Sequence, residues 1–299
     1  MSIGKHPCPE DFVHDFSPQG TAELLTYISS GKNYSAPRII SRLLHRIRCW
    51  LPYTRMSNDV EAELLLATIS AEYGDINPQT IQKALTEKFK DDHLRKFEYA
   101  FYAKCLARDD VVKGTIVDFG GGSSFSTIVP MLFRFASAEM VSIDISLRNR
   151  SSRFGVRYIQ GNCCNTGLPS SSADLVSLIS TLEHIGLGRY SDLLAVDGDI
   201  RCMREVWRVL RPGKHLVLTI PYGYPTVVFN LHRIYDEGRF RMITEGFEPV
   251  LVEYSKLGQP CFKQEIEGAR ALVNVPGFYG PTKRHPNAQG GVLALLRKP

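Results

Sequence analysis

After Gly114 the sequence changes to short apolar, β-rich runs that alternate with helical stretches, and this alternation constrains the fold more than any other feature. Such alternation is typical of parallel strands joined by crossover helices. It predicts strands at Thr115–Phe119, Met140–Ile145, Arg157–Gln160, Asp174–Ser180, His215–Pro221, Phe247–Tyr254 and Gly291–Arg297. It predicts helices at Ser124–Ala136, Ile200–Leu210 and near Asp236–Glu245. We therefore expect an α/β fold with a mostly parallel sheet flanked by helices.

The residues before this alternation have the spacing of helices. Apolar residues recur at helical intervals in Val60–Ile69 and Ile81–Leu106, and Asn77-Pro78 suits a helix start. We divide the chain into an N-terminal helical accessory or lid segment, 1–110, and a main domain, 111–299, with loop insertions at about 222–246 and 256–289. Tyr99 and Tyr102 are interpreted as packing residues; a lid over a ligand is the alternative.

Composition is that of an ordinary globular protein, with 43% apolar and 22% charged residues. The net charge is +5, but 31 acidic residues accompany 36 basic ones without a long cationic block, so a nucleic acid partner is not favoured. Seven cysteines without C-x-x-C spacing fit a reducing compartment. No run of 18 apolar residues predicts a transmembrane segment. We expect a cytoplasmic protein, with peripheral membrane contact through the basic amphipathic stretch Ile39–Leu51 as the alternative to packing of that helix.

Three glycines, Gly120 to Gly122, follow the first predicted strand and would let the backbone approach a ligand closely. Such a loop does not by itself separate nicotinamide, flavin and S-adenosylmethionine sites. A dinucleotide site usually has a third glycine at the helix start, where this chain has serines. Asp118 would repel a pyrophosphate but could receive the cationic methionine end of S-adenosylmethionine, directly or through water. The charge favours the sulfonium compound.

Two later positions fit an adenosine. Asp144 ends the second predicted strand, where a carboxylate can accept hydrogen bonds from both ribose hydroxyls; capping of the next segment is the alternative. Asn162 and Cys163 follow the third strand and would lie beside the adenine. Cys163 and Cys164 are interpreted as packing residues rather than a redox pair.

The ordered segments Ile116–Gly122, Asp144, Ala173–Val176 and Leu210–Lys214 resemble the class I S-adenosylmethionine-dependent methyltransferases over about Lys113–Lys298. The resemblance implies a Rossmann-like methyltransferase sheet whose last strand is antiparallel, with S-adenosylmethionine as cofactor. Ser124 and Asn162 depart from the pattern, in place of a frequent third glycine and a frequent acid. The expected cofactor-binding residues are Asp118, Gly120, Gly121, Gly122, Ser123, Asp144, Ile145, Asn162, Cys163 and Ser180.

Glu183 and His184 follow the fourth predicted strand, at the sheet edge where ligands of open α/β sheets bind. A hydroxyl that attacks a methyl group must lose its proton, and an imidazole is a suitable general base. We predict that His184 is this base and that Glu183 orients it or contacts the cofactor. The alternative is that both side chains only satisfy loop backbone groups.

A narrower resemblance is carried by residues 183–190, Asp197-Gly198-Asp199 and residues 229–235, which look like a little-characterised methyltransferase family associated with polysaccharide and glycolipid synthesis. It implies O-methylation of a sugar hydroxyl, with Arg189, Tyr190 and Arg233 as substrate contacts and His232 as a second candidate base. A divalent metal on Asp192, Asp197 and Asp199 is not favoured, because capping and turn formation explain these acids. Methylation of another small molecule or of RNA, and a non-catalytic cofactor-binding scaffold, remain the competing hypotheses.

Overall fold

The computed structural model describes residues 58–90, 92, 94–111, 114–121, 125–133, 138–146, 152, 154–228, 232–256, 259–267 and 290–299. They belong to one compact unit, Asn58–Pro299. The expectations for Ile39–Leu51 and for Gly122 and Ser123 lie outside the described residues. Within those ranges, no helix is both long and apolar enough to cross a membrane.

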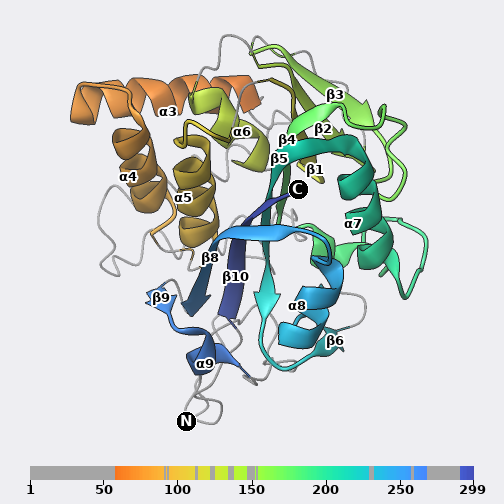
Figure 1. Ribbon diagram of the computed structural model, residues 1–299. Helices are drawn as coiled ribbons and strands as arrows, with labels where there is room; N and C mark the ends of the chain where they lie inside the picture. Colours follow the sequence, from red (N-terminus) through yellow and green to blue (C-terminus); the bar gives the residue numbers. More distant parts are fainter. Residues whose placement is uncertain are drawn as a thin grey trace, which may run out of the picture. The chain divides into compact units, whose positions relative to one another are not determined.

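An eight-stranded sheet in the order β3-β2-β1-β4-β5-β10-β8-β9 forms the centre of this unit (Figure 1). The strands are β1 Ile116–Phe119, β2 Met140–Asp144, β3 Val156–Gln160, β4 Ala173–Ile179, β5 Leu210–Tyr222, β8 Glu248–Lys256, β9 Gln259–Cys261 and β10 Gly290–Arg297. Strands β1 to β5 pair in parallel, whereas β10 is antiparallel to both β5 and β8. The predicted mostly parallel sheet with an antiparallel last strand is confirmed.

Helices cover both faces of the sheet, with α3 to α6 on one side and α7 and α8 on the other (Figure 1). The helices are α3 Asn58–Tyr73, α4 Pro78–Lys88, α5 Arg95–Leu106, α6 Phe125–Leu132, α7 Gly198–Val209, α8 Glu237–Ile243 and α9 Lys263–Ile266, with a 3-10 turn, η2, at Leu182–His184. Asn77 caps α4 as predicted, because its side chain accepts hydrogen bonds from two backbone amides of the first turn.

Successive apolar side chains of the central strands point to opposite faces of the sheet, so helices must cover both faces. Ile116 of β1 and Leu175 of β4 lie in the apolar cluster with α3 to α6, whereas their neighbours Val117 and Val176 lie in the cluster with α7 and α8. A parallel sheet buried on both faces is expected to have such continuous apolar strands.

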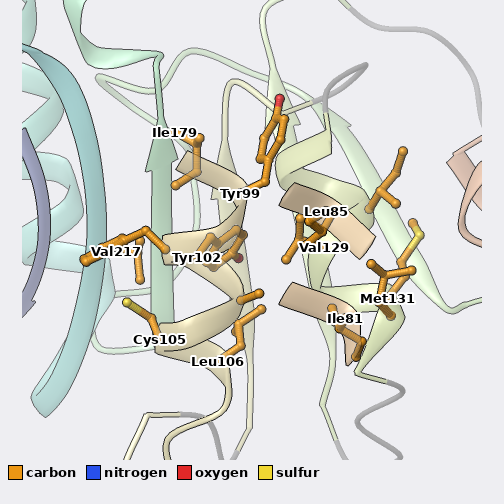
Figure 2. Packing of buried hydrophobic residues seen from close by; sticks show 14 of the residues in the cluster. Ile81, Leu85, Tyr99, Tyr102, Cys105, Leu106, Val129, Met131, Ile179 and Val217 are labelled. Atoms are coloured by element: carbon orange, nitrogen blue, oxygen red, sulfur yellow. The ribbon is translucent and has the colours of Figure 1, made fainter. Parts of the chain in front are cut away.

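Helix α5 packs against α4 and α6 and also contacts β5 and β10 of the sheet. Figure 2 shows Tyr102 and Cys105 of α5 among side chains of α4, α6, β4 and β5. Tyr99 and Tyr102 are 4% and 0% exposed, as the packing interpretation requires. Burial of side chains of this size contributes about 1.5–3 kcal/mol each.

A two-stranded hairpin inside the expected loop insertion was not predicted. Strands β6 Thr226–Val228 and β7 His232–Ile234 pair antiparallel, and β7 packs against η2. Three residues are too few to produce a readable alternation. The hairpin matters because it brings His232 to the carboxyl end of β4.

Candidate active site

The glycine turn after β1 is fixed by what surrounds it. Gly120 has φ +78°, and a β-carbon there would overlap the side chain of Thr181, which follows β4. A β-carbon on Gly121 would overlap the carboxylate of Asp118. Close packing against Thr181 and Asp118 therefore requires glycine at both positions, and the turn presents backbone without side chains at the carboxyl end of β1.

Asp118 lies fully buried beneath this turn. Its Oδ2 accepts hydrogen bonds from Ser126 Oγ at 3.0 Å and Thr127 Oγ1 at 2.8 Å, and its Oδ1 accepts one from Ser177 Oγ at 2.8 Å. Burial raises the pKa of Asp118 to about 6, against the opposing effect of these hydroxyls. Full burial leaves Asp118 no open surface for the expected direct contact with a ligand. The Thr127 hydroxyl that bonds Asp118 also lies 2.6 Å from the carbonyl of Gly121, which ties Asp118 to the turn.

Asp144 ends β2 beside the turn. Its Oδ1 accepts hydrogen bonds from the amide and hydroxyl of Ser146, both at 2.8 Å, which is the capping arrangement considered as the alternative. The other oxygen has no hydrogen bond from a described residue and can still accept one from a ligand. The carbonyl of the next residue, Ile145, accepts a hydrogen bond from Gln160 at 3.2 Å.

Residues after β3 lie beside the same turn. Cys163 is buried and contacts the backbone amide of Gly120, and burial raises its pKa. Asn162 is exposed and its Oδ1 accepts a hydrogen bond from the amide of Cys164 at 2.8 Å, so its amide nitrogen is the group left for a ligand. The candidate cofactor residues therefore converge from the ends of β1, β2 and β3.

The end of β4 holds a strained residue. Ser180 has φ 46°, a left-handed conformation that is costly for a residue other than glycine. Its amide donates to the carbonyl of Thr219 in β5 at 3.1 Å, and its hydroxyl donates to Glu98 Oε1 of α5. Strain of this kind clusters at ligand sites and persists only where neighbouring contacts impose it.

Glu98 is the charged anchor of this region and is 2% exposed. Its Oε1 accepts a second hydrogen bond from Thr219 Oγ1 at 2.8 Å, and its Oε2 accepts one from Arg95 at 2.8 Å. Sequence reasoning did not single out Glu98. The signal was present, because Glu98 stands at helical spacing between Leu94, Phe101 and Cys105 on the apolar side of α5.

The predicted catalytic residues lie together next to Glu98. The Nε2 atom of His184 is 3.7 Å from Oε1 of Glu183, and the ring of His184 lies 6.4 Å from that of His232 and 5.7 Å edge-on from that of Tyr190. Arg189 lies over the Tyr190 ring, 5.3 Å from its centre. The turn η2, the loop after it and strand β7 thus supply one cluster at the carboxyl end of β4, next to Glu98 of α5.

Burial shifts two of these groups in opposite senses. The pKa of Glu183 is raised to about 8, first by burial and further by the charge of Glu98. Burial, with a smaller effect of the charge of Arg189, lowers the pKa of His232 to about 4. Near neutral pH both side chains are therefore mainly uncharged. The site therefore places a neutral carboxylic acid and a neutral imidazole near each other at neutral pH.

Arg233 does not lie where a substrate contact requires it. The side chain is 3% exposed, and its guanidinium donates to the carbonyls of Ile185 at 2.5 Å and Ala195 at 3.2 Å. The expected contact is thus corrected: Arg233 clamps the loop after η2. A polar residue in a sequence motif can be there to satisfy buried carbonyls rather than a ligand.

The loop after η2 returns to α7 through a close backbone contact. A β-carbon on Gly186 would overlap the carbonyl of Ala195, and one on Gly198 would approach the Gly186 backbone. Asp199, fully buried at the start of α7, accepts hydrogen bonds from Arg239 at 2.8 Å and Tyr235 at 3.2 Å. These contacts account for Gly186 of the loop and for Gly198 and Asp199 of the Asp197-Gly198-Asp199 motif.

The three acids considered for a metal have separate roles. Asp192 accepts a hydrogen bond from the amide of Gly186 at 2.6 Å, Asp197 pairs with Arg201 at 2.9 Å, and Asp199 belongs to the buried network. Across the described ranges, no group of three or more His, Cys, Asp or Glu side chains could hold a metal ion.

Comparison with known proteins gives a partial family match. A family model described as "Caenorhabditis protein of unknown function, DUF268" matches residues 163–268, fewer than half of the chain. No curated protein matches the sequence. The matched range includes η2, the loop after it, α7 and the β6–β7 hairpin.

Solved structures resemble the chain at low identity. A 1,6-didemethyltoxoflavin-N1-methyltransferase of Burkholderia thailandensis is 11% identical, covering 83% of this chain and 94% of that chain at a TM-score of 0.45. A geranyl diphosphate C-methyltransferase of Streptomyces coelicolor is 12% identical, covering 73% and 84% at 0.45. The cyclase SpnF is 17% identical, covering 67% and 81% at 0.43. None of these scores reaches 0.5, so the function of this chain rests on its own residues.

Proposed function

We propose that this chain is an S-adenosylmethionine-dependent O-methyltransferase whose acceptor is a sugar hydroxyl of a glycan or glycan precursor. The observation that carries the proposal is the cluster of Glu183, His184, His232 and Tyr190 at the carboxyl end of β4, next to the bare backbone of the Gly120 turn. Open α/β sheets bind their ligands at this edge.

The cofactor part of the proposal rests on fit. The Gly120–Gly121 turn presents backbone without side chains at the carboxyl end of β1, Asp144 keeps an oxygen for ribose, and Asn162 keeps its amide nitrogen for adenine. When bound, S-adenosylmethionine supplies a methyl group activated by the sulfonium charge. Asp118 supports the turn from below rather than contacting the ligand.

The acceptor part of the proposal rests on the chemistry of the cluster. His184 and Glu183 can remove the hydroxyl proton, and neutral His232 can hydrogen-bond the hydroxyl that reacts. Tyr190 is 51% exposed beside His184, and an aromatic ring is suited to the apolar face of a sugar, as Arg189 is to its hydroxyl edge. Arg233 has no part in this contact.

Calorimetric titration tests the cofactor site. Gly120→Ala should abolish measurable S-adenosylmethionine binding, because the new methyl group meets Thr181 and the backbone is forced from φ +78°. Gly167→Ala is the matched control, since Gly167 has φ +70° with open space around it and should keep its affinity. Asp144→Ala should weaken binding roughly tenfold or more, the value of a charged hydrogen bond. Equal affinity in all four proteins would refute this site.

Transfer of labelled methyl groups to a panel of sugar acceptors, with and without chelator, tests the chemistry. His184→Ala should lower kcat by about 100-fold or more, the usual contribution of general base catalysis, with little change in cofactor affinity. Full turnover of that variant would remove His184 as the base. Methyl transfer to RNA or to other small molecules, with none to sugars, would show that the proposed acceptor is wrong. The proposal of a methyltransferase would still hold.

A further inference from the structure

Glu98 and Glu183 are two buried carboxylates in neighbouring positions, 2% exposed each. Glu98 is paired on both oxygens, because it accepts hydrogen bonds from the Ser180 and Thr219 hydroxyls and from Arg95. Glu183 differs, since its Oε2 has no hydrogen-bond partner among the described residues. An ionised carboxylate with a bare buried oxygen is costly, so the environment favours a proton on Glu183.

Ser180 lies near both acids but serves only one of them. Its hydroxyl has a single proton and donates it to Glu98 Oε1. The strained backbone of Ser180 holds the side chain in this position. The Ser180 proton therefore does not satisfy the bare Oε2 of Glu183.

A cationic ligand would reverse this state. Glu183 is two residues from Thr181, the side chain that meets the glycine turn, and the amide of His184 bonds back to the carbonyl of Thr181 at 3.0 Å. A positive charge bound at the turn would favour ionised Glu183. S-adenosylmethionine and its demethylated product differ by the positive charge on sulfur. The charged ligand should therefore favour loss of the Glu183 proton, whereas the uncharged product should not.

Resting on the proposed function, we propose that Glu183 is a proton-exchanging residue: it releases its proton when the sulfonium charge binds beside Thr181, and it takes up the acceptor proton when that charge is lost. In transfer, the acceptor oxygen bonds to the methyl carbon, the carbon–sulfur bond breaks and sulfur keeps the electron pair. The hydroxyl proton passes to Glu183, directly or through His184 at 3.7 Å.

Other charged groups around Glu183 are fixed by their own pairs. Asp199 pairs with Arg239, and Arg233 is held by loop carbonyls. Arg95, Glu98 and Tyr235 interact electrostatically with Glu183, and His184 lies beside it on η2. The elements packed against η2 are β7, α7 and β5, and their titratable and charged side chains are His232, Arg233, Asp199, Arg201, Cys202, Arg204, Glu205, Arg208, Arg211, Lys214, His215 and Tyr222. Of these, Glu98 raises the pKa of Glu183 more than the neighbouring Arg95, its ion-pair partner, lowers it.

Proton counting by calorimetry tests the proposal on the full chain. S-adenosylmethionine and S-adenosylhomocysteine are titrated separately near pH 7, each in two buffers of different ionisation enthalpy. The charged ligand should release close to one more proton than the uncharged ligand. Its Kd, relative to that of the uncharged ligand, should fall by up to about tenfold per pH unit from pH 6 to 8 and then level off.

Variants distinguish a failure of this proposal from a failure of the proposed function. Glu183→Gln, which resembles the protonated side chain, should bind both ligands and release equal numbers of protons. Glu248→Gln, which breaks only an exposed pair with Arg297, should keep the difference seen in the unmodified protein. Glu98→Gln should move the pH midpoint downward. Equal proton release by both ligands in the unmodified protein would overturn the role of Glu183 with the cofactor site intact; failure of both ligands to bind would overturn the proposed function and this inference together.

Discussion

Two buried acids, Asp199 and Glu183, lie on either side of the loop after η2, and they differ in how completely they are paired. Asp199 accepts hydrogen bonds from Arg239 and Tyr235 and lies 4.0 Å from Arg233. Glu183 has one oxygen without a hydrogen-bond partner in the described part of the chain. A fully paired buried acid holds structure, whereas an incompletely paired acid at a sheet edge is a candidate for chemistry. Burial alone does not separate the two roles.

The largest effect should come from breaking the paired cluster. Asp199→Ala leaves the buried positive charge of Arg233 without its neighbour and frees Arg239, so the free energy of unfolding should fall by about 3–5 kcal/mol. Urea denaturation of the purified protein measures this. Glu248→Ala, at an exposed ion pair, should change stability by at most about 1 kcal/mol. Comparable losses in the two variants would mean that the Asp199 cluster does not hold the loop.

Sequence reasoning reached the sheet and the site by different routes. Short apolar runs and the glycine turn depend on neighbouring residues, so β1 to β4 and the Gly120 turn could be predicted closely. Strand β5 begins at Leu210, before the predicted start at His215. The grouping of Glu183 and His184 also followed, because both stand directly after β4.

What sequence reasoning missed depends on contacts between distant segments. Glu98 reaches Thr219 across 121 positions, and Arg233 reaches Ile185 across 48. An arginine that clamps carbonyls and one that binds a sugar have the same side chain, and only the surrounding backbone separates them. The burial of Asp118 was missed for the same reason, since its partners Ser126, Thr127 and Ser177 are visible only once the fold is formed.

An intermediate effect should appear in the pH dependence of stability. The pKa of Glu183 is raised from 4.5 to about 8 on folding, so the folded chain binds this proton more tightly than the unfolded chain. The resulting stability is fully present below pH 4.5 and is lost as the pH rises through 8. The contribution of Asp118, with a pKa of about 6, ends earlier, and that of His232 acts in the opposite sense between pH 6.5 and 4.

The interval from pH 6.5 to 8 therefore isolates Glu183. Stability of the unmodified protein should fall there by up to about 1.4 kcal/mol per pH unit relative to Glu183→Gln. Urea titrations of both proteins at half-unit intervals measure the difference. Parallel curves would place an ionised Glu183 in the folded protein and make it resemble Asp199 after all.

The smallest effect on stability should come from the open side of the unpaired cluster. Tyr190 is 51% exposed and contacts His184 edge-on, a pair worth about 0.5–1.5 kcal/mol at most. Tyr190→Ala should therefore lower the free energy of unfolding by about 1 kcal/mol or less. Phe262→Ala, at an aromatic side chain 78% exposed before α9, is the control for loss of a surface ring.

The two aromatic variants should differ in how well they bind the acceptor. Tyr190→Ala should raise the KM for a sugar acceptor severalfold while the Kd for S-adenosylmethionine stays unchanged, because the ring borders the acceptor side of His184 and not the glycine turn. Phe262→Ala should leave both constants unchanged. A loss of several kcal/mol in Tyr190→Ala would instead make this ring part of the support of the loop, and the division between a closed cluster at Asp199 and an open one at Glu183 would no longer hold.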